Sequence, residues 1–215
     1  MKNITAYDTE GAIYKDRPNS ENTSAWMMAN TNKAGVTGKL GAGLAGADVF
    51  IGVSAPNILT EADVASMAPD SIVFAMANPD PEIAYDDALK VRDDIIMATG
   101  RSDHPNQVNN VLGFPFIFRG ALDVRSTGIN DAMKIAAVRA IADLAKENVP
   151  DEVAEAYGHQ SFAFGRDLII PKPLDPRLIT YVAPAVAKAA MESGVARQPI
   201  QDWPAYQKEL LNRIG

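Results

Sequence analysis

Short, nearly continuous runs of apolar residues recur in the first half of the chain. Three of them have the pattern of buried strands, at residues 47–53, 71–76 and 95–98. Helix-like segments separate these runs, at residues 60–67 and 81–91. Apolar strands that alternate with helices are typical of a parallel sheet that is covered on both faces. The pattern therefore predicts an α/β fold for this part of the chain.

The second half of the chain has a mostly helical pattern. Apolar positions between Ile129 and Leu144 fall on one face of a long amphipathic helix. Asp175 is expected to cap another helix, with Pro176 in its first turn. This helix is expected to kink at Pro184 and to end at Gly194. A last helix is expected over residues 203–214.

A short β-prone run, Ile4–Tyr7, lies near the start of the chain and ends at Asp8. An acidic residue that closes an early strand is where dinucleotide-binding domains hydrogen-bond the adenosine ribose. In those domains a glycine-rich phosphate loop precedes the acid by about 20 residues, whereas seven residues precede Asp8 here. Taken alone, Asp8 is more often the start of a turn. If Asp8 is the ribose-binding acid, the seven residues before it are too few for the first strand and its loop. We predict a Rossmann-like parallel sheet that lacks its first strand and its glycine-rich loop.

Loss of a central first strand would leave backbone groups unpaired, at a cost of about 1–3 kcal/mol for each buried group. We expect one of three arrangements that avoid these unpaired backbone groups. Residues 4–7 pair directly with residues 48–53, another chain fills the gap, or the amino-terminal segment leaves the sheet. Residues 1–125 are expected to form the truncated dinucleotide-binding domain, and residues 126–215 a helical segment that packs on it within the same domain.

The glycines Gly41, Gly43 and Gly46 match the spacing of the dinucleotide fingerprint. That fingerprint follows a strand and opens a helix, so that the pyrophosphate meets the helix N-terminus. Here the glycines follow a helix that is expected around residues 25–34, and they precede the strand at 47–53. We interpret them as a glycine-rich connection and not as a phosphate site.

Small and polar residues follow the predicted strands. In open parallel sheets, ligands bind beyond the carboxyl ends of the strands. Small side chains allow a cofactor to approach, and a carboxamide supplies both a donor and an acceptor. The candidates for cofactor contact at these ends are Val53, Ser54, Ala55 and Asn78.

Four carboxamides occur within the five residues 106–110. They are too polar for a simple core segment. Their side chains either cap loops or make two-sided hydrogen bonds to a hydroxy-acid substrate, and both interpretations stay open. Asn109 and Asn110 are the substrate-binding candidates in this run.

Composition and charge exclude several classes of protein. The net charge is −7 and no Lys/Arg cluster is present, which argues against a nucleic-acid partner. No cysteine and only two histidines are present, so a thiolate nucleophile is absent and a histidine-built metal site or triad has little support. The apolar runs fall far short of the ~20 residues that span a membrane. With no signal or transit pattern at the start, we expect a cytoplasmic protein.

Several segments together resemble the NAD(P)-binding half of bacterial malic enzymes. They are residues 46–52, 74–82, 98–103, 105–123, 169–173 and 183–194. The run Asn-Gln-Val-Asn-Asn-Val at 106–111 is the most specific of them. The likeness is weakest over residues 18–42.

This resemblance implies oxidative decarboxylation of malate to pyruvate and CO2, with hydride transfer to NAD or NADP. It implies that Asp8 lies near the adenosine ribose and that Val53–Ala55 run along the cofactor. It places Asn78 near the nicotinamide and the substrate, and Asn110 on the substrate. No residue of the chain is given a catalytic role.

The resemblance also implies that a tyrosine acid, a lysine base, the ligands of Mg2+ or Mn2+ and the glycine loop lie in an amino-terminal malic-enzyme segment outside this chain. The chain alone is then expected to be inactive, and the complete enzyme to be a homo-oligomer. The alternatives are a non-catalytic regulatory module that binds NAD(P) or malate, and a truncated gene product. The choice of NAD or NADP stays open, because Asp8 would repel a 2′-phosphate while Lys15 and Arg17 could offset that repulsion.

Overall fold

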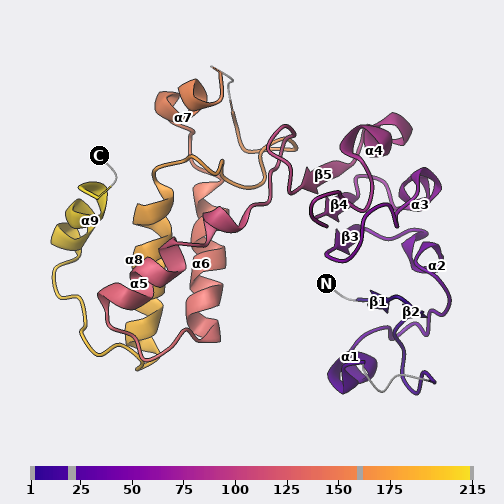
Figure 1. Ribbon diagram of the computed structural model, residues 1–215, viewed down its shortest axis with the longest axis horizontal. Helices are drawn as coiled ribbons and strands as arrows, with labels where there is room; N and C mark the ends of the chain where they lie inside the picture. The colour runs from indigo at the N-terminus through magenta and orange to yellow at the C-terminus, as the bar shows by residue number, and fades with distance from the viewer. Residues whose placement is uncertain (1–2, 19–22, 159–161, 214–215) are drawn as a thin grey trace. The chain divides into compact units, whose positions relative to one another are not determined.

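The computed structural model describes residues 3–18, 23–158 and 162–213 (Figure 1). The chain forms two compact units, Met1–Gly100 and Arg101–Gly215, called the first and second unit below. The division falls at residue 100, earlier than the domain boundary expected at residue 125. That domain boundary stays a prediction.

The first unit contains the expected parallel sheet (Figure 1). Its strands pair in the order β3-β4-β5, with Val49 of β3 opposite Ile72 of β4, and Ile72 opposite Ile96 of β5. This confirms the α/β fold. The strands and the helices between them are β3 (Val49–Gly52), α3 (Glu61–Ser66), β4 (Ile72–Ala75), α4 (Tyr85–Val91) and β5 (Ile96–Thr99).

Local sequence signals explain where the first helix of this sheet begins. The hydroxyl of Thr60 accepts a hydrogen bond from the Asp63 N–H at 3.1 Å, and the Asp63 carboxylate accepts one from the Thr60 N–H at 3.0 Å. This reciprocal capping box satisfies two donors that the first helical turn leaves free. Val64 of the same helix is completely buried and joins Phe50 and Val73 in the core of the unit.

The two faces of the sheet differ. Helices α2, α3 and α4 lie on one side of the strands (Figure 1), and Phe50 of β3 is buried there. Neighbouring side chains of a strand point to opposite faces, and Ile51 is 53% exposed. The cover expected on both faces is therefore incomplete in this unit.

The amino-terminal segment does not join the parallel sheet, which is the third of the expected arrangements. It forms an antiparallel hairpin of β1 (Tyr7–Asp8) and β2 (Gly11–Ala12). The strand expected at 4–7 is therefore misplaced, because the chain turns back immediately after Asp8 and Gly11 takes a φ of +127° that suits glycine. Among the residues described, β3 is hydrogen-bonded to a strand on one side only.

The glycine motif precedes strand β3, as the sequence predicted. Gly41 and Gly43 lie in the single helical turn α2 (Gly41–Leu44), which follows α1 (Ala25–Asn30). A Cβ atom at Gly43 would lie 1.9 Å from the hydroxyl oxygen of Tyr7. The glycine therefore allows close packing against the hairpin, and the interpretation as a connection is supported.

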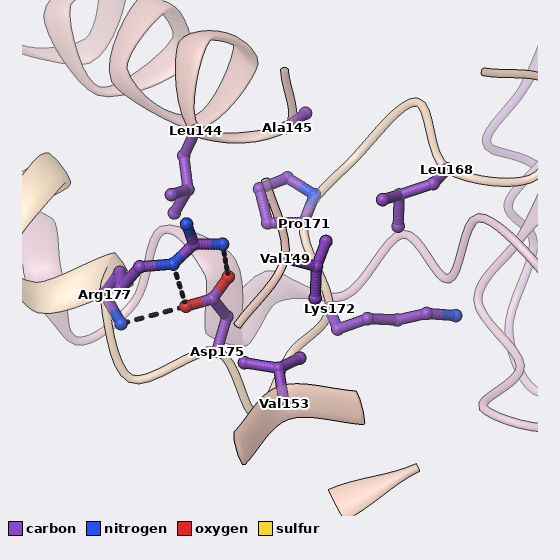
Figure 2. A pocket seen from close by; sticks show the side chains of 9 residues that line it. All are labelled: Leu144, Ala145, Val149, Val153, Leu168, Pro171, Lys172, Asp175 and Arg177. Atoms are coloured by element: carbon purple, nitrogen blue, oxygen red, sulfur yellow. Dashed lines mark hydrogen bonds and ion pairs between the residues drawn. The ribbon is translucent and has the colours of Figure 1, made fainter. Parts of the chain in front are cut away.

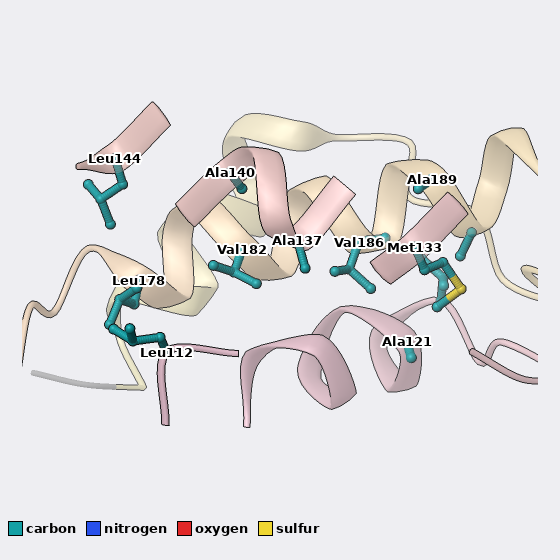
Figure 3. Packing of buried hydrophobic residues seen from close by; sticks show 13 residues of the cluster. Leu112, Ala121, Met133, Ala137, Ala140, Leu144, Leu178, Val182, Val186 and Ala189 are labelled. Carbon is teal, nitrogen blue, oxygen red and sulfur yellow. The ribbon is translucent and has the colours of Figure 1, made fainter. Parts of the chain in front are cut away.

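The second unit is helical, as expected (Figure 3). Helices α5 and α6 both pack on α8, and their apolar faces form one core that includes Met133, Val182 and Val186. Gly120 lies at the α5–α8 contact, where a Cβ atom would be 2.3 Å from the Ala183 carbonyl oxygen. The elements are η1 (Asn110–Leu112), α5 (Phe116–Asp123), α6 (Asp131–Leu144), α7 (Asp151–Ala156), α8 (Leu178–Glu192) and α9 (Trp203–Leu211).

The start of α8 corrects the sequence prediction. The helix begins at Leu178 with Arg177 as its N-cap, so Asp175 and Pro176 precede it. The buried Asp175 carboxylate instead forms an ion pair with Arg177 at 2.7 Å. The expected end is confirmed, because Gly194 follows the C-cap with a φ of +74°.

Helix α9 has Asp202 as its N-cap, and the position expected for its end, Ile214, lies outside the described residues. Within the described ranges, none of the helices is long and apolar enough to cross a membrane.

Candidate dinucleotide-binding site

The candidate cofactor residues follow the carboxyl ends of β3 and β4. Gly52 and Ala75, the last residues of these strands, are paired in the sheet register, so the following loops start at the same edge. Val53, Ser54 and Ala55 are exposed after β3. Asn78 is exposed after β4, and its carboxamide has no hydrogen-bond partner among the residues that the structure describes. This edge offers small residues, backbone groups and one free carboxamide to a ligand.

A buried carboxylate connects these two loops. Glu82 is completely buried. Its Oε1 accepts a hydrogen bond from the Ser54 N–H at 3.1 Å, and its Oε2 accepts one from the Ala77 N–H at 3.0 Å. Sequence reasoning missed Glu82, because a single acidic residue after a proline has the appearance of an ordinary loop charge.

Glycine at position 52 makes room for this carboxylate. A Cβ atom at Gly52 would lie 2.3 Å from the Cδ of Glu82 and 2.4 Å from its Oε1. Two backbone hydrogen bonds add to the connection, from Asn57 N–H to Pro81 O at 3.1 Å and from Leu59 N–H to Glu82 O at 3.0 Å. The loops after β3 and β4 are thus fixed to each other by both side-chain and backbone bonds.

Asp8, the candidate for ribose binding, forms an ion pair with Arg17. The two guanidinium nitrogens of Arg17 donate to the two carboxylate oxygens of Asp8 at 2.9 and 2.5 Å. The side chain of Arg17 is 7% exposed and that of Asp8 is 34% exposed. The Arg17 guanidinium lowers the pKa of Asp8 to about 2. Asp8 is therefore ionised at neutral pH, with its charge balanced by a buried cation.

The carboxamides of the second unit have different environments. Asn106 is buried, with its amide nitrogen donating to Arg166 O at 2.7 Å and its oxygen accepting from the Ile169 N–H at 2.9 Å. Asn109 is exposed and caps η1 by accepting from the Val111 N–H at 3.0 Å.

Asn110 differs from both of these neighbours. It is exposed, and within the described ranges its side chain forms no hydrogen bond. Of the two substrate-binding candidates in this run, Asn110 has the free carboxamide.

The chain's carboxylates do not form a metal site in the described residues. No group of three or more His, Asp or Glu side chains is arranged there to hold an ion. Asp87 and Asp94 are instead paired with the neighbouring cations Lys90 and Arg92.

A small cavity in the second unit has the character of a packing void (Figure 2). Its volume is about 10 Å3, which is room for about one water molecule. Asp175 and Arg177 form their ion pair at its wall. Lys172 places its Nζ 4.6 Å from the ring centre of Phe162, and burial lowers its pKa. These contacts give the Lys172 side chain a place in the packing of the second unit.

Comparison with known proteins identifies the family. Residues 1–157 match the model of the family described as malic enzyme, NAD binding domain. This chain belongs to the malic enzyme NAD-binding domain family. The family accounts for the parallel sheet of the first unit, and its match extends through the carboxamide run into α7.

Curated malic enzymes are similar over almost the whole chain. An NADP-dependent malic enzyme of Rhizobium meliloti (strain 1021) is 56% identical over 212 residues, which are 99% of this chain and 28% of that protein. An NAD-dependent malic enzyme of the same organism is 49% identical over 97% of this chain and 27% of its own length. The chain therefore spans little more than a quarter of these two malic enzymes.

A solved malic enzyme supports the fold. The crystal structure of malic enzyme from Pyrococcus horikoshii Ot3 aligns with a TM-score of 0.78 and 37% identity. The alignment covers 94% of this chain and 44% of that chain. The likeness thus includes residues well beyond the first unit.

Proposed function

We propose that this chain is the NAD(P)-binding part of a malic enzyme, which converts (S)-malate to pyruvate and CO2 while reducing NAD(P)+. One observation carries the proposal. The family's sheet presents, at a single edge, the exposed loop Val53–Ala55 and the unpartnered carboxamide of Asn78. A dinucleotide binds at such an edge in open parallel sheets.

The cofactor fits the residues present. Ser54 and Ala55 have small side chains that allow a planar ring or a ribose to approach the backbone. Asn78 can donate to a carbonyl and accept from an amide, as the carboxamide of nicotinamide requires. When bound, NAD(P)+ supplies the hydride acceptor, and the residues of this chain hold and orient it.

Substrate contact is proposed for the carboxamides. Asn110 is exposed with a free side chain, which suits hydrogen bonding to the hydroxyl or a carboxylate of malate. Asn78 is proposed as a second contact. Asn109 stays a candidate through its amide nitrogen, since its oxygen already caps η1.

We propose that the ribose end of the site accepts NADP. A free carboxylate at Asp8 would repel a 2′-phosphate, but here both carboxylate oxygens bind the guanidinium of Arg17. Because Arg17 balances the charge of Asp8, the carboxylate repels a 2′-phosphate less strongly. The 56% identical relative is named NADP-dependent, and the 49% identical relative is named NAD-dependent.

The metal expected of the reaction does not fit residues described here, because none of their carboxylates forms a ligand cluster. We propose that the acid, the base and the Mg2+ or Mn2+ ligands are supplied by a further malic-enzyme segment, and that the active assembly is a homo-oligomer. The small share of the relatives' length that the chain spans supports the proposal of a further segment.

A chimera tests the proposed function. The chain replaces the matching 212-residue segment of the Rhizobium meliloti NADP-dependent malic enzyme. We expect malate-dependent reduction of NADP+ in the presence of Mn2+, and at least a tenfold loss of kcat/KM in an Asn78→Ala chimera. A folded chimera that shows no malate-dependent reduction of NADP+ or NAD+ would contradict the proposal.

A further inference from the structure

We infer that Glu82 is a positioning residue for the proposed cofactor site, because its buried carboxylate holds the loops after β3 and β4 in a fixed relation. The inference rests on the proposed function in that these loops are the ones assigned to NAD(P) and malate. Glu82 does not touch the cofactor in this account. It acts through the backbone amides of Ser54 and Ala77.

The geometry requires a carboxylate at this position. Both oxygens of Glu82 accept hydrogen bonds from backbone N–H groups, and the side chain is completely buried. A glutamine would place an NH2 donor opposite one of these N–H donors, so one bond would be replaced by a repulsive contact. An aspartate, one methylene shorter, would not reach both amides from the same backbone position. The site therefore distinguishes glutamate from its closest substitutes.

The two amides adjoin the candidate ligand contacts. Ser54 is itself a candidate, and Ala77 immediately precedes Asn78. A buried carboxylate that accepts two N–H bonds limits the motion of both peptide groups. It thereby fixes the direction in which the Asn78 carboxamide and the Ser54–Ala55 peptide face the ligand. Close alignment of reacting groups affects rate strongly, so a loop displaced by a small distance is costly.

Glycine at position 52 provides a second, independent sign of this arrangement. A Cβ atom there would overlap the carboxylate at 2.3 Å. Glycine in a strand often marks a site where another group approaches the backbone closely. Here the approaching group is the Glu82 carboxylate.

Amide hydrogen exchange tests the connection on the 215-residue chain itself. In the unaltered chain, we expect the Ser54 and Ala77 amides to exchange at least tenfold more slowly than the same amides in an unstructured peptide. In Glu82→Gln, we expect both amides to lose this protection, while the amides of Ile72 and Ile96, which donate to Asp48 O and Ser71 O in the sheet, keep theirs. Glu61→Gln is the matched control, because Glu61 is exposed on α3 of the same unit.

Kinetics in the malic-enzyme chimera test the consequence for function. We expect E82Q to raise KM for NADP+ or lower kcat by about tenfold or more, and E61Q to match the unaltered chimera. We expect Glu82→Asp to lower activity as well, because the shorter side chain does not reach both amides.

Unprotected Ser54 and Ala77 amides in the unaltered chain would overturn the inference even if E82Q does not fold. Unchanged chimera kinetics in a folded E82Q would also overturn it. If the unaltered chimera is inactive, the proposed function fails, and the exchange measurement alone then decides whether Glu82 positions the loops.

Discussion

At the scale of the residue, neighbouring carboxamides have different roles. Asn106 is buried and fully hydrogen-bonded, Asn109 caps η1, and Asn110 has a free side chain among the described residues. The sequence left two interpretations open for this run. The structure assigns loop-supporting bonds to the first two and leaves the Asn110 carboxamide and the Asn109 amide nitrogen as candidates for substrate contact. The bonds of Asn106 could not be predicted, because they join residues about 60 positions away such as Ile169.

The first prediction separates Asn110 from Asn109. In the malic-enzyme chimera, Asn110→Ala should lower kcat/KM for malate by about 5- to 150-fold, since a substrate oxygen left unpaired costs roughly 1–3 kcal/mol. Asn109→Ala should mainly lower thermal stability, because it removes a cap worth about 1 kcal/mol. Steady-state kinetics with malate and NADP+ varied separately check this. An Asn110→Ala effect confined to the KM of NADP+ would show that the assignment is wrong.

The second prediction concerns the pH dependence of stability. The pKa of Asp8 is lowered to about 2 in the folded chain, while an unfolded Asp titrates near 3.9. The ion pair with Arg17 therefore stabilises the fold above about pH 4, and this stabilisation is lost as the pH falls toward 2. Because the Asp8 side chain is a third exposed, we expect a contribution on the order of 1 kcal/mol.

Urea unfolding of Asp8→Asn measures this contribution. The variant should be less stable than the unaltered chain at pH 7, and the difference should shrink between pH 4 and pH 2. Asp103→Asn is a useful comparison, because the pKa of Asp103 is also lowered to about 2 by an arginine, but that pair is exposed. If both variants lost the same unfolding free energy, this would contradict the expectation that burial of Arg17 strengthens its ion pair with Asp8.

At the scale of the element, the sequence predicted the parallel strands and most helices correctly. Apolar runs and caps such as Thr60 are local signals, and they place β3, β4, β5, α3 and α6 within a few residues. The amino-terminal strand and the start of α8 were misplaced. Asp8 pairs with Arg17, nine residues farther along the chain, which the local strand pattern does not indicate. Asp175 pairs with Arg177, only two residues away, and this ion pair replaces the helix cap that the Asp-Pro pattern favoured.

The third prediction tests the packing of α5 on α8. Gly120→Ala should destabilise the chain by roughly 1–3 kcal/mol, because the added Cβ would lie 2.3 Å from the Ala183 carbonyl oxygen and the helices must move apart. Alanine's higher helix propensity offsets only about 1 kcal/mol of the gross cost. The control is Gly128→Ala, whose Cβ would meet nothing within 4 Å. Unfolding in urea should separate the two variants, and equal stability would argue against the close contact.

At the scale of the whole molecule, the chain has the sheet of a dinucleotide-binding domain without a strand beside the free edge of β3 in the described residues. Ile51 and Val53 of this region are 53% and 75% exposed. Ile51 projects from the open face of the sheet and Val53 lies in the loop after β3, whereas the unpaired backbone N–H and C=O groups at the β3 edge can pair with another segment. This arrangement agrees with a chain that functions together with more of a malic enzyme.

The fourth prediction is that the 215-residue chain alone does not turn over malate. The reason is that its described residues provide no metal-ligand cluster, and the proposed acid and base are assigned to another segment. The assay contains purified chain, malate, Mn2+ and either NAD+ or NADP+. Turnover at ordinary enzyme rates, on the order of 1–1000 per second, would show that the chain contains a complete active site.

The most direct test of the central claim is a map of amide chemical shifts during titration of the 215-residue chain with NADP+. We expect saturable shifts at Ser54, Ala55, Ala77 and Asn78, and at Asp8 where the ribose is proposed to bind, with weak binding on the order of 1 mM. Shifts of this size should be absent at Lys172 and around the small cavity of the second unit. Saturable shifts located elsewhere, with the ends of β3 and β4 unaffected, would contradict the account.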